Sequence, residues 1–338
     1  MNTGHGQGHC FVVDSSTGEI ARRPEADHNR RVQDPQNYWL QKLRQLNPNI
    51  SNAKGDGAAR FAPHKPLLLL ALLDLAEQAG PAGIGPRIAL SADLRVRFLE
   101  SWSIVVARWG TKPEIRLPFY HLSSQEFWKP LRTDGTASAA PESTAAIELH
   151  PGFAACLSVP GFRNLARHVL IQSWFPADEQ LGLYALLDET PDGGATTAML
   201  VEEAAKIAVA TGRDARFRIQ VVGQYVFTCA LTGYALTAAN SGATLVEAAH
   251  IADFATSRNN DPRNGLALTP DAHWSFDEHL WTIDENLRVV VARNAFSDSS
   301  PEGSSLARFH GRPLFFHAQS RLRPHEEFLA RHRARFTI

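Results

Sequence analysis

The chain of 338 residues lacks several features that would define a protein class at once. Its three cysteines, Cys10, Cys156 and Cys229, lie far apart and form no Cys-x-x-Cys pair. This arrangement disfavours a disulfide framework or a four-cysteine zinc site, and it fits a reducing compartment. No apolar run approaches the ~18 residues that cross a bilayer, and the N-terminus lacks the cationic start and apolar block of a secretion signal. We therefore expect a cytoplasmic protein that makes no membrane contact.

The sequence also lacks a large net charge, since 34 Lys and Arg residues face 35 Asp and Glu residues. A neutral total argues against simple wrapping of nucleic acid, but the charges are segregated along the chain. Basic residues outnumber acidic ones over residues 22–66 and 306–338, whereas residues 178–203 carry acidic residues and no Lys or Arg. Most of the cations are Arg, whose planar fork suits phosphate, although a GC-rich genome produces the same bias. The pattern indicates two basic surfaces joined by an acidic connector.

The length favours two domains, because the chain is about twice the ~150 residues of a typical domain. The content of 44% hydrophobic and 20% charged residues is typical of a globular protein. Composition predicts five segments: a tail over residues 1–36, a first domain over 37–176, an acidic linker over 177–212, a second domain over 213–297 and an Arg-rich extension over 298–338. In the tail, His5, His9 and Cys10 have metal-ligand spacing, and we expect them to bind metal only adventitiously.

The first domain is predicted to be mainly helical with a short sheet. Pro66 leads into a buried helix over residues 67–79, and Ser91 can cap a second helix. Residues 116–122 are predicted as a strand, and residues 153–175 as a further helical segment.

The second domain has a different pattern. We expect a helix over residues 216–225, a strand over 244–251, a polar loop over 252–265, a helix that begins at Thr269-Pro270 and a hairpin over 280–292.

Three residues of the second domain carry the sharpest chemical signal. His250 ends the run Glu247-Ala248-Ala249-His250; Asn264 follows 14 residues later, and His273 lies 9 residues beyond Asn264. This order over strand, loop and helix resembles the HNH nuclease motif, a ββα unit that holds one divalent metal. The flanking run Cys229-Ala230-Leu231-Thr232-Gly233 agrees with it. Alone, each residue could be an ordinary core, turn or surface residue; together, in the right order, they favour an HNH endonuclease domain over residues 213–292.

The expected chemistry is phosphodiester hydrolysis. His250 is the predicted general base, because an imidazole titrates near neutral pH. By resemblance, Asn264 positions the loop and the base. His273 and Asp277 are four residues apart on a helix, so they face one side and can share a metal. The expected metal is Mg²⁺ or Mn²⁺, while a site that contains His also tolerates Ni²⁺ or Zn²⁺.

The sequence departs from the HNH pattern at one position. Many HNH enzymes place an Asp or His metal ligand immediately before the base, where this chain has Ala249. Strand alternation puts Glu247 on the same side as residue 249, so Glu247 is the candidate substitute ligand. This departure also keeps open a DNA-binding sensor whose nuclease site has lost its metal.

The first domain resembles the sulfur-binding domain of modification-dependent (type IV, McrA-like) restriction endonucleases, which recognise phosphorothioate DNA. The resemblance rests on Ala62-Pro63-His64-Lys65-Pro66 before a leucine run, on Leu117-Pro118-Phe119-Tyr120-His121-Leu122 before Phe127-Trp128, and on Trp174-Phe175-Pro176. The fold class expected is therefore α+β, with a mainly helical DNA-reading domain linked to a ββα-metal HNH domain.

Sulfur is larger, softer and less hydrated than phosphate oxygen, so a shallow apolar cup favours it through the lower cost of desolvation. The predicted DNA- and sulfur-binding residues fall into two groups. Leu117, Pro118, Phe119 and Tyr120 belong to the cup segment, and Arg60, His64, Lys65 and Arg116 hold phosphates and base edges. The alternative is that Phe119 is a core residue and Pro118 only ends a strand.

The sequence thus predicts a phosphorothioate-dependent HNH restriction endonuclease that acts on double-stranded DNA. A first domain that reads methylated or hydroxymethylated cytosine is the rival interpretation. A double-strand break needs two active sites, which favours a homodimer, although nothing in the sequence encodes one. The Arg-rich residues after Leu306 are expected to pack beside the nuclease domain or to contact the DNA backbone.

Overall fold

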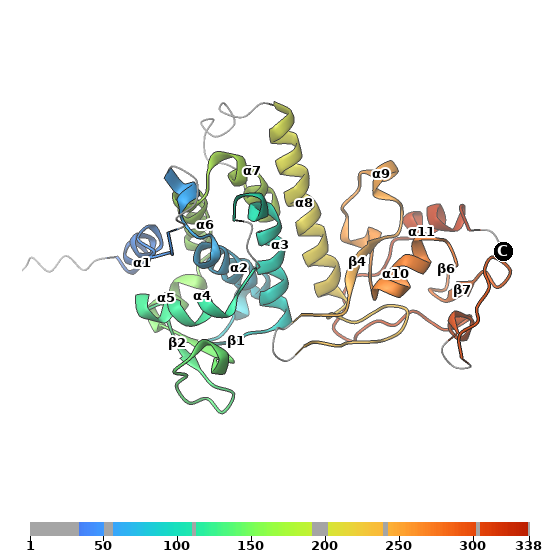
Figure 1. Ribbon diagram of the computed structural model, residues 1–338, viewed down its shortest axis with the longest axis horizontal. Coiled ribbons are helices and arrows are strands. Elements are labelled where there is room, and N and C mark those ends of the chain that lie inside the picture. Colours follow the sequence, from blue (N-terminus) through green and yellow to red (C-terminus); the bar gives the residue numbers. More distant parts are fainter. Residues whose placement is uncertain are drawn as a thin grey trace, which may run out of the picture. The chain divides into compact units, whose positions relative to one another are not determined.

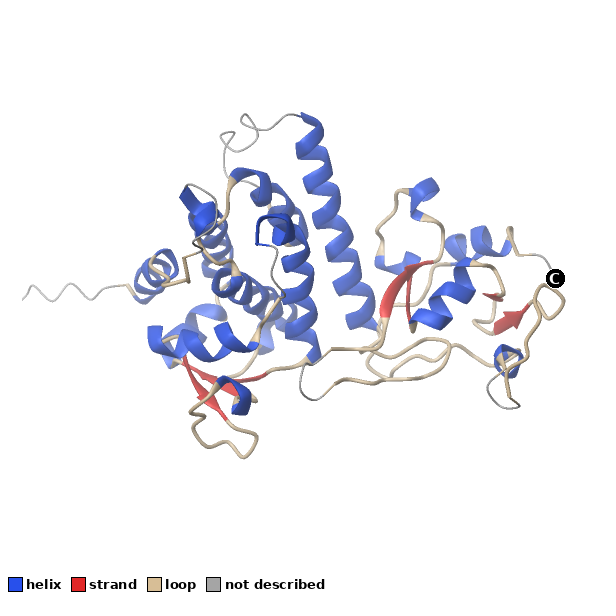
Figure 2. Ribbon diagram, in the orientation of Figure 1, coloured by secondary structure: helices blue, strands red, loops and turns tan. Residues whose placement is uncertain are grey.

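The computed structural model describes residues 34–50, 57–109, 113–190, 202–238, 243–301 and 305–336. Almost all of the predicted tail, with His5, His9 and Cys10, lies outside these ranges. Within Pro35–Ile338, which packs as one unit, the buried side chains form two hydrophobic clusters. Figures 1 and 2 show mostly helices in the part of the chain before α8 and short strands with short helices in the part after it. The α+β fold class is confirmed, while the predicted domain limits stay a prediction.

The first cluster is enclosed mainly by helices. Its helices are α1 (Pro35–Arg44), α2 (His64–Ala79), α3 (Ala92–Trp109), α4 (Arg116–His121), α5 (Pro151–Leu157), α6 (Pro160–Trp174) and α7 (Ala177–Leu186). Strands β1 (Arg87–Ala89), β3 (Ala146–Leu149) and β2 (Trp128–Leu131) form one antiparallel sheet in that order. Helix α2 is apolar on all sides because it is covered by α3, α4 and α6. The predicted cap is confirmed, since the Leu94 N–H donates to Ser91 Oγ.

The buried carboxylate of Asp74 pairs with arginines from two other helices. Asp74 of α2 is 2% exposed and accepts hydrogen bonds from Arg97 of α3 and from Arg216 of α8 (Glu202–Gln224). The Arg216 Nη1–Asp74 Oδ1 distance is 2.7 Å. A carboxylate this deeply buried is stable only when it is paired, so Asp74 specifies how α2, α3 and α8 pack.

The predicted strand over residues 116–122 is wrong, because Arg116–His121 is helix α4. Pro118 lies in its first turn, where the missing N–H costs no hydrogen bond. Ile115, Phe119 and Leu122 recur at helical spacing, and each is at most 1% exposed. The predicted helical segment over 153–175 is in fact two helices, α5 and α6, which separate where Pro160 begins α6.

The predicted acidic linker also contains packed helices. Helix α7 lies against α8, and the two backbones approach closely at Gly182 and Gly212. A Cβ at Gly212 would lie 2.1 Å from the Gly182 carbonyl oxygen, so only glycine fits at this crossing. Helix α8 runs through the predicted boundary at residue 212, and it gives Ile219 to the first cluster and Phe217 to the second.

The second cluster carries the predicted strand-loop-helix arrangement. Strands β4 (Glu247–His250) and β5 (Gly265–Leu268) pair antiparallel, and α10 (Pro270–Asp277) follows directly. The predicted hairpin is confirmed as β6 (Trp281–Ile283) and β7 (Val289–Val291). Two helices complete this part: α9 (Phe254–Ser257) and the C-terminal α11 (Glu326–Arg333). Within the described residues, no helix combines the length and hydrophobicity needed to span a membrane.

Candidate active site

The end of β4 places His250 beside helix α8. His250 pairs with Gly265 of β5, and the next residue, Ile251, donates its backbone N–H to Asn264 O at 2.9 Å. A Cβ at Gly265 would lie 2.3 Å from a methyl group of Val221 on α8. The glycine therefore allows β5, and with it the paired end of β4, to pack directly on α8.

The His250 ring is held by aromatic neighbours and by one hydrogen-bond partner. It stacks on Phe217 with centroids 3.9 Å apart and planes 6° apart, and Phe254 lies 5.2 Å away. His250 Nε2 lies 3.0 Å from Asn260 Oδ1. Burial lowers the pKa of His250, against the opposing effects of the Asn260 hydrogen bond and of Asp214. The imidazole is therefore neutral near pH 7, which is the form that accepts a proton.

Asn264 lies behind the site and makes no contact with solvent, since it is 0% exposed. Its Oδ1 accepts the Ala252 N–H at 2.8 Å, and its Nδ2 donates to the carbonyl oxygens of Ala252 and Asn259. These bonds close the loop between β4 and β5. Such placement agrees with the expectation that Asn264 positions the loop rather than transferring protons.

His273 lies between two carboxylates. Its Nδ1 is 2.7 Å from Glu247 Oε1, and its Nε2 is 3.4 Å from Asp277 Oδ2. The structure thus brings together all three predicted metal ligands, but Glu247 and Asp277 lie at opposite edges of the His273 imidazole. Burial raises the pKa of Asp277, although His273 and His279 act in the opposite direction. Ala249 is 0% exposed in the second core, so a ligand at that position would have to be buried.

The donor set fits a divalent cation at His273 Nε2 and Asp277. Two ligands that each lie ~2.1 Å from a metal are about 3.0–3.4 Å apart, which matches the observed 3.4 Å. Glu247 instead occupies the position of a carboxylate that orients a metal-bound histidine. Within the described ranges, no group of three or more His, Cys, Asp or Glu side chains is arranged to hold a metal by itself. A cation held by His273 and Asp277 would fill its other positions with water or substrate oxygens, as Mg²⁺ commonly does.

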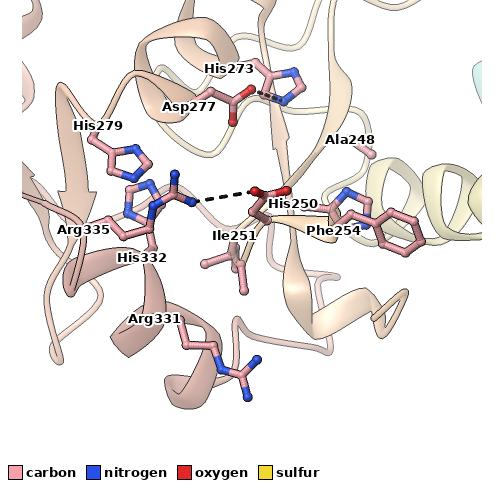
Figure 3. A pocket seen from close by; sticks show the side chains of 12 residues that line it. Ala248, His250, Ile251, Phe254, His273, Asp277, His279, Arg331, His332 and Arg335 are labelled. Carbon is pink, nitrogen blue, oxygen red and sulfur yellow. Dashed lines mark ion pairs between the residues drawn. The ribbon is translucent and has the colours of Figure 1, made fainter. Parts of the chain in front are cut away.

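His250, His273 and Asp277 line one cavity of about 430 Å³, whereas Glu247 and Asn264 do not line it. Figure 3 shows His273 and Asp277 above the cavity, His250 beside Phe254 on one side, and His279, His332 and Arg335 on the other. The cavity provides room for a phosphate between the predicted base and the predicted cation site.

The Arg-rich residues after Leu306 are expected to pack beside the nuclease domain or to contact DNA, and two of them line this cavity. Arg331 and Arg335 come from the C-terminal helix and its end, more than fifty residues beyond α10. Asn260, which hydrogen-bonds His250 and Asp214, and Asp214 itself do not line this cavity, and they carry no local signal because they lie in a polar loop and on a helix far apart in sequence.

A second cavity of about 430 Å³ lies in the helical part and collects half of the predicted DNA-reading residues. His64, Lys65, Leu117 and Pro118 line it, together with Trp109. Burial lowers the pKa of His64 to about 4 and also lowers the pKa of Lys65. The side chains of both residues are therefore partly removed from water, beside apolar walls.

The other four predicted residues do not line this cavity. Phe119 is 1% exposed in the first core, so its prediction as a cup wall is wrong. The Tyr120 hydroxyl donates to the Ala139 carbonyl, and Arg116 Nη1 donates to the Glu142 carbonyl. The Arg60 guanidinium lies 4.8 Å from the Phe61 ring centroid.

A match to one family model supports the nuclease interpretation. Residues 229–284 match the model of the family described as HNH endonuclease. Among solved structures, the chain is similar to a "Modification dependent TagI restriction endonuclease", with a TM-score of 0.29 and 22% identity over 37% of this chain and 38% of that chain. No curated protein matches the sequence. The chain therefore contains an HNH endonuclease domain, and HNH nucleases generally use a divalent metal.

Proposed function

We propose that the protein is a modification-dependent restriction endonuclease that binds phosphorothioate DNA through the cavity at His64 and Pro118 and hydrolyses nearby phosphodiester bonds at His250. The observation that carries the hydrolytic half is that His250, His273 and Asp277 line one cavity. The double-stranded DNA substrate, and a homodimer that would cut both strands, are part of this proposal.

In the proposed reaction, neutral His250 accepts a proton from a water molecule, whose oxygen attacks phosphorus while the bond from phosphorus to the 3′ oxygen breaks. Phe217 and Asn260 hold the imidazole in place for this transfer. His273 and Asp277 would hold the divalent cation, oriented by Glu247. A bound cation supplies positive charge to the phosphate and to the departing oxygen.

The recognition half rests on the chemistry of the second cavity. Leu117, Pro118 and Trp109 give it apolar walls, and His64 is neutral near pH 7 because burial lowers its pKa to about 4. A site with few hydrated charges stabilises a weakly hydrated sulfur more readily than a strongly hydrated oxygen. Lys65 remains as a cation beside the bound phosphate group.

Digestion of plasmids with and without phosphorothioate, in Mn²⁺ or Mg²⁺, tests both halves. We expect cleavage of the sulfur-containing plasmid only, and loss of that cleavage in His250→Ala. Unchanged cleavage by His250→Ala would remove His250 as the base. Equal cutting of both plasmids would contradict the sulfur specificity and leave an HNH nuclease without it.

A matched pair of variants tests the recognition cavity separately. Leu117 and Val106 are 47% and 49% exposed, but only Leu117 lines the cavity. In gel-shift assays, Leu117→Glu should lose binding to a phosphorothioate duplex, while Val106→Glu should keep it. Competition with methylated, hydroxymethylated and plain duplexes distinguishes the rival readings of the modification. Binding without cleavage in any metal would favour the non-cleaving sensor.

A further inference from the structure

A hydrogen-bond chain behind His250 lies outside the proposed proton-transfer and metal-binding groups. Asn260 Oδ1 lies 3.0 Å from His250 Nε2, and Asn260 Nδ2 donates to Asp214 Oδ1 at 2.8 Å. Asp214 belongs to α8, and Asn260 belongs to the loop between β4 and β5. These hydrogen bonds therefore link the His250 imidazole to helix α8, which contributes residues to both hydrophobic clusters.

The donor and acceptor groups of these residues fix the direction of both hydrogen bonds. A carboxylate can only accept hydrogen bonds, so Asp214 requires the NH₂ group of Asn260 to face it. The carbonyl oxygen of Asn260 must then face His250, and an oxygen can only accept there. His250 Nε2 therefore carries the proton, and Nδ1 keeps the free lone pair.

We propose that Asp214 and Asn260 are positioning residues that hold His250 in the tautomer protonated at Nε2, so that Nδ1 is the atom that accepts the proton from water. This inference rests on the proposed nuclease function. Among the residues that the structure describes, Asn260 is the hydrogen-bond partner of the His250 ring, so no other group there selects the tautomer.

The surroundings keep this arrangement rigid. The parallel Phe217 ring, 3.9 Å away, opposes rotation of the imidazole about its axis. The loop that carries Asn260 is anchored by Asn264, whose Nδ2 donates to the Asn259 carbonyl at 3.0 Å. Phe217 lies one helical turn after Asp214 on α8, so one helix supplies both the stacking ring and the carboxylate.

The substitution Asp214→Asn gives the sharpest test. The amide that it introduces could present its own NH₂ group, which would let the Asn260 amide turn its NH₂ toward Nε2 and favour the tautomer protonated at Nδ1. We expect kcat for phosphorothioate plasmid to fall about 10- to 100-fold, since a general base contributes typically 10²- to 10⁴-fold, with KM within about twofold. The exchanged pair Asp214→Asn/Asn260→Asp restores an acceptor toward Nε2 and should recover most of kcat.

The tautomer itself is measured by long-range ¹H–¹⁵N spectra of histidine-labelled protein, with His250 assigned from its absence in His250→Ala. Wild type and the exchanged pair should be protonated at Nε2, and Asp214→Asn should shift toward Nδ1. Asp188→Asn is the matched control, because Asp188 lines the same groove as Asn260 and its substitution removes the same charge. This control should leave both readouts unchanged.

The outcomes separate this inference from the proposed function. Unchanged kcat and an unchanged tautomer in Asp214→Asn would overturn the inference while cleavage by wild type still stands. A loss of kcat that the exchanged pair does not recover, with an unaltered tautomer, would also overturn it and indicate a structural role. If wild type cleaved no plasmid, the proposed function would be refuted. The spectra alone would then show at which ring nitrogen of His250 the contacts of Asp214 and Asn260 hold the proton.

Discussion

The contact between α7 and α8 makes a strong stability prediction at Gly212. A Cβ at this position would lie 2.1 Å from the Gly182 carbonyl oxygen and 2.9 Å from Ala185 Cβ. Ordinary contacts between carbon and oxygen are ~3.3 Å or longer, so in Gly212→Ala the helices must separate by about 1 Å. Neither obstacle is the end of a flexible side chain, so relaxation must come from the backbone.

The expected cost follows from two opposing effects. Overpacking typically costs about 1–3 kcal/mol, and this clash with the main chain belongs at the upper end. Replacing glycine by alanine inside a helix returns ~1 kcal/mol through helix propensity. We therefore expect Gly212→Ala to lower the free energy of unfolding by about 2 kcal/mol.

Gly223 supplies a matched control on the same helix. A Cβ at Gly223 meets no heavy atom within 4 Å, so Gly223→Ala should gain up to ~1 kcal/mol from propensity alone. Urea unfolding followed by circular dichroism should then place the two midpoints on opposite sides of wild type, separated by on the order of 1 M. A midpoint for Gly212→Ala at or above that of wild type would show that α7 and α8 do not cross at van der Waals contact.

Three further predictions concern charged and titratable groups. Burial lowers the pKa of His332, which is 5% exposed, to about 4, so the unfolded chain binds this proton more readily than the folded protein between pH 6.5 and 4. The free energy of unfolding should therefore fall by on the order of 3 kcal/mol as the pH drops through that window. In His332→Gln, the urea midpoint should depend less on pH between 7 and 4. Glu247→Gln should weaken Mn²⁺ binding in calorimetry by roughly 10- to 100-fold through loss of the negative charge beside His273, whereas Glu285→Gln at the hairpin turn should not. Asp74→Ala should cost about 3–5 kcal/mol in urea unfolding, because it leaves two arginines without their shared buried partner.

The strand-loop-helix of the nuclease was predictable because its signals are local. In residues 244–292 the strand, the helix start at Thr269-Pro270 and the hairpin lie where they were predicted, although Thr269 makes no side-chain cap hydrogen bond and α9 lies within the predicted loop. The strand predicted over 116–122 is wrong for two reasons. The helical spacing of the buried residues starts at Ile115, one residue before the predicted segment, and Pro118 can stand in the first turn of a helix as well as end a strand.

The surroundings of the His250 imidazole could not be predicted from such local signals. Asp214 and Asn260 are 46 residues apart, and Phe217 lies 33 residues before His250. Nothing in their local patterns distinguishes them from other polar or apolar helix and loop residues. They meet only because α8 packs on β5 at Gly265, which is a consequence of tertiary packing rather than of periodicity.

The structure shows which partners the charged residues that are segregated along the sequence contact. One acidic residue of the predicted connector, Glu189, pairs with Arg167, whose side chain is 4% exposed. Asp74 does the same for Arg97 and Arg216. These arginines pair within the protein and are already desolvated, so they cannot be counted as a surface for DNA.

Cations near the two cavities remain as candidates to attract DNA. Arg331 and Arg335 at the C-terminal helix line the nuclease cavity, with side chains 55% and 61% exposed, and the half-buried Lys65, whose Nζ donates to the Asn47 carbonyl oxygen, lines the proposed recognition cavity. A substrate phosphate at the nuclease cavity would meet Arg335, which lies 3.8 Å from Asp253. Because exposed ion pairs of this kind are weak, a phosphate can compete for the guanidinium. The charge of the C-terminal extension thus acts at the proposed site of cleavage, while Arg97 and Arg216 hold together α2, α3 and the helix α8 on which His250 of β4 stacks.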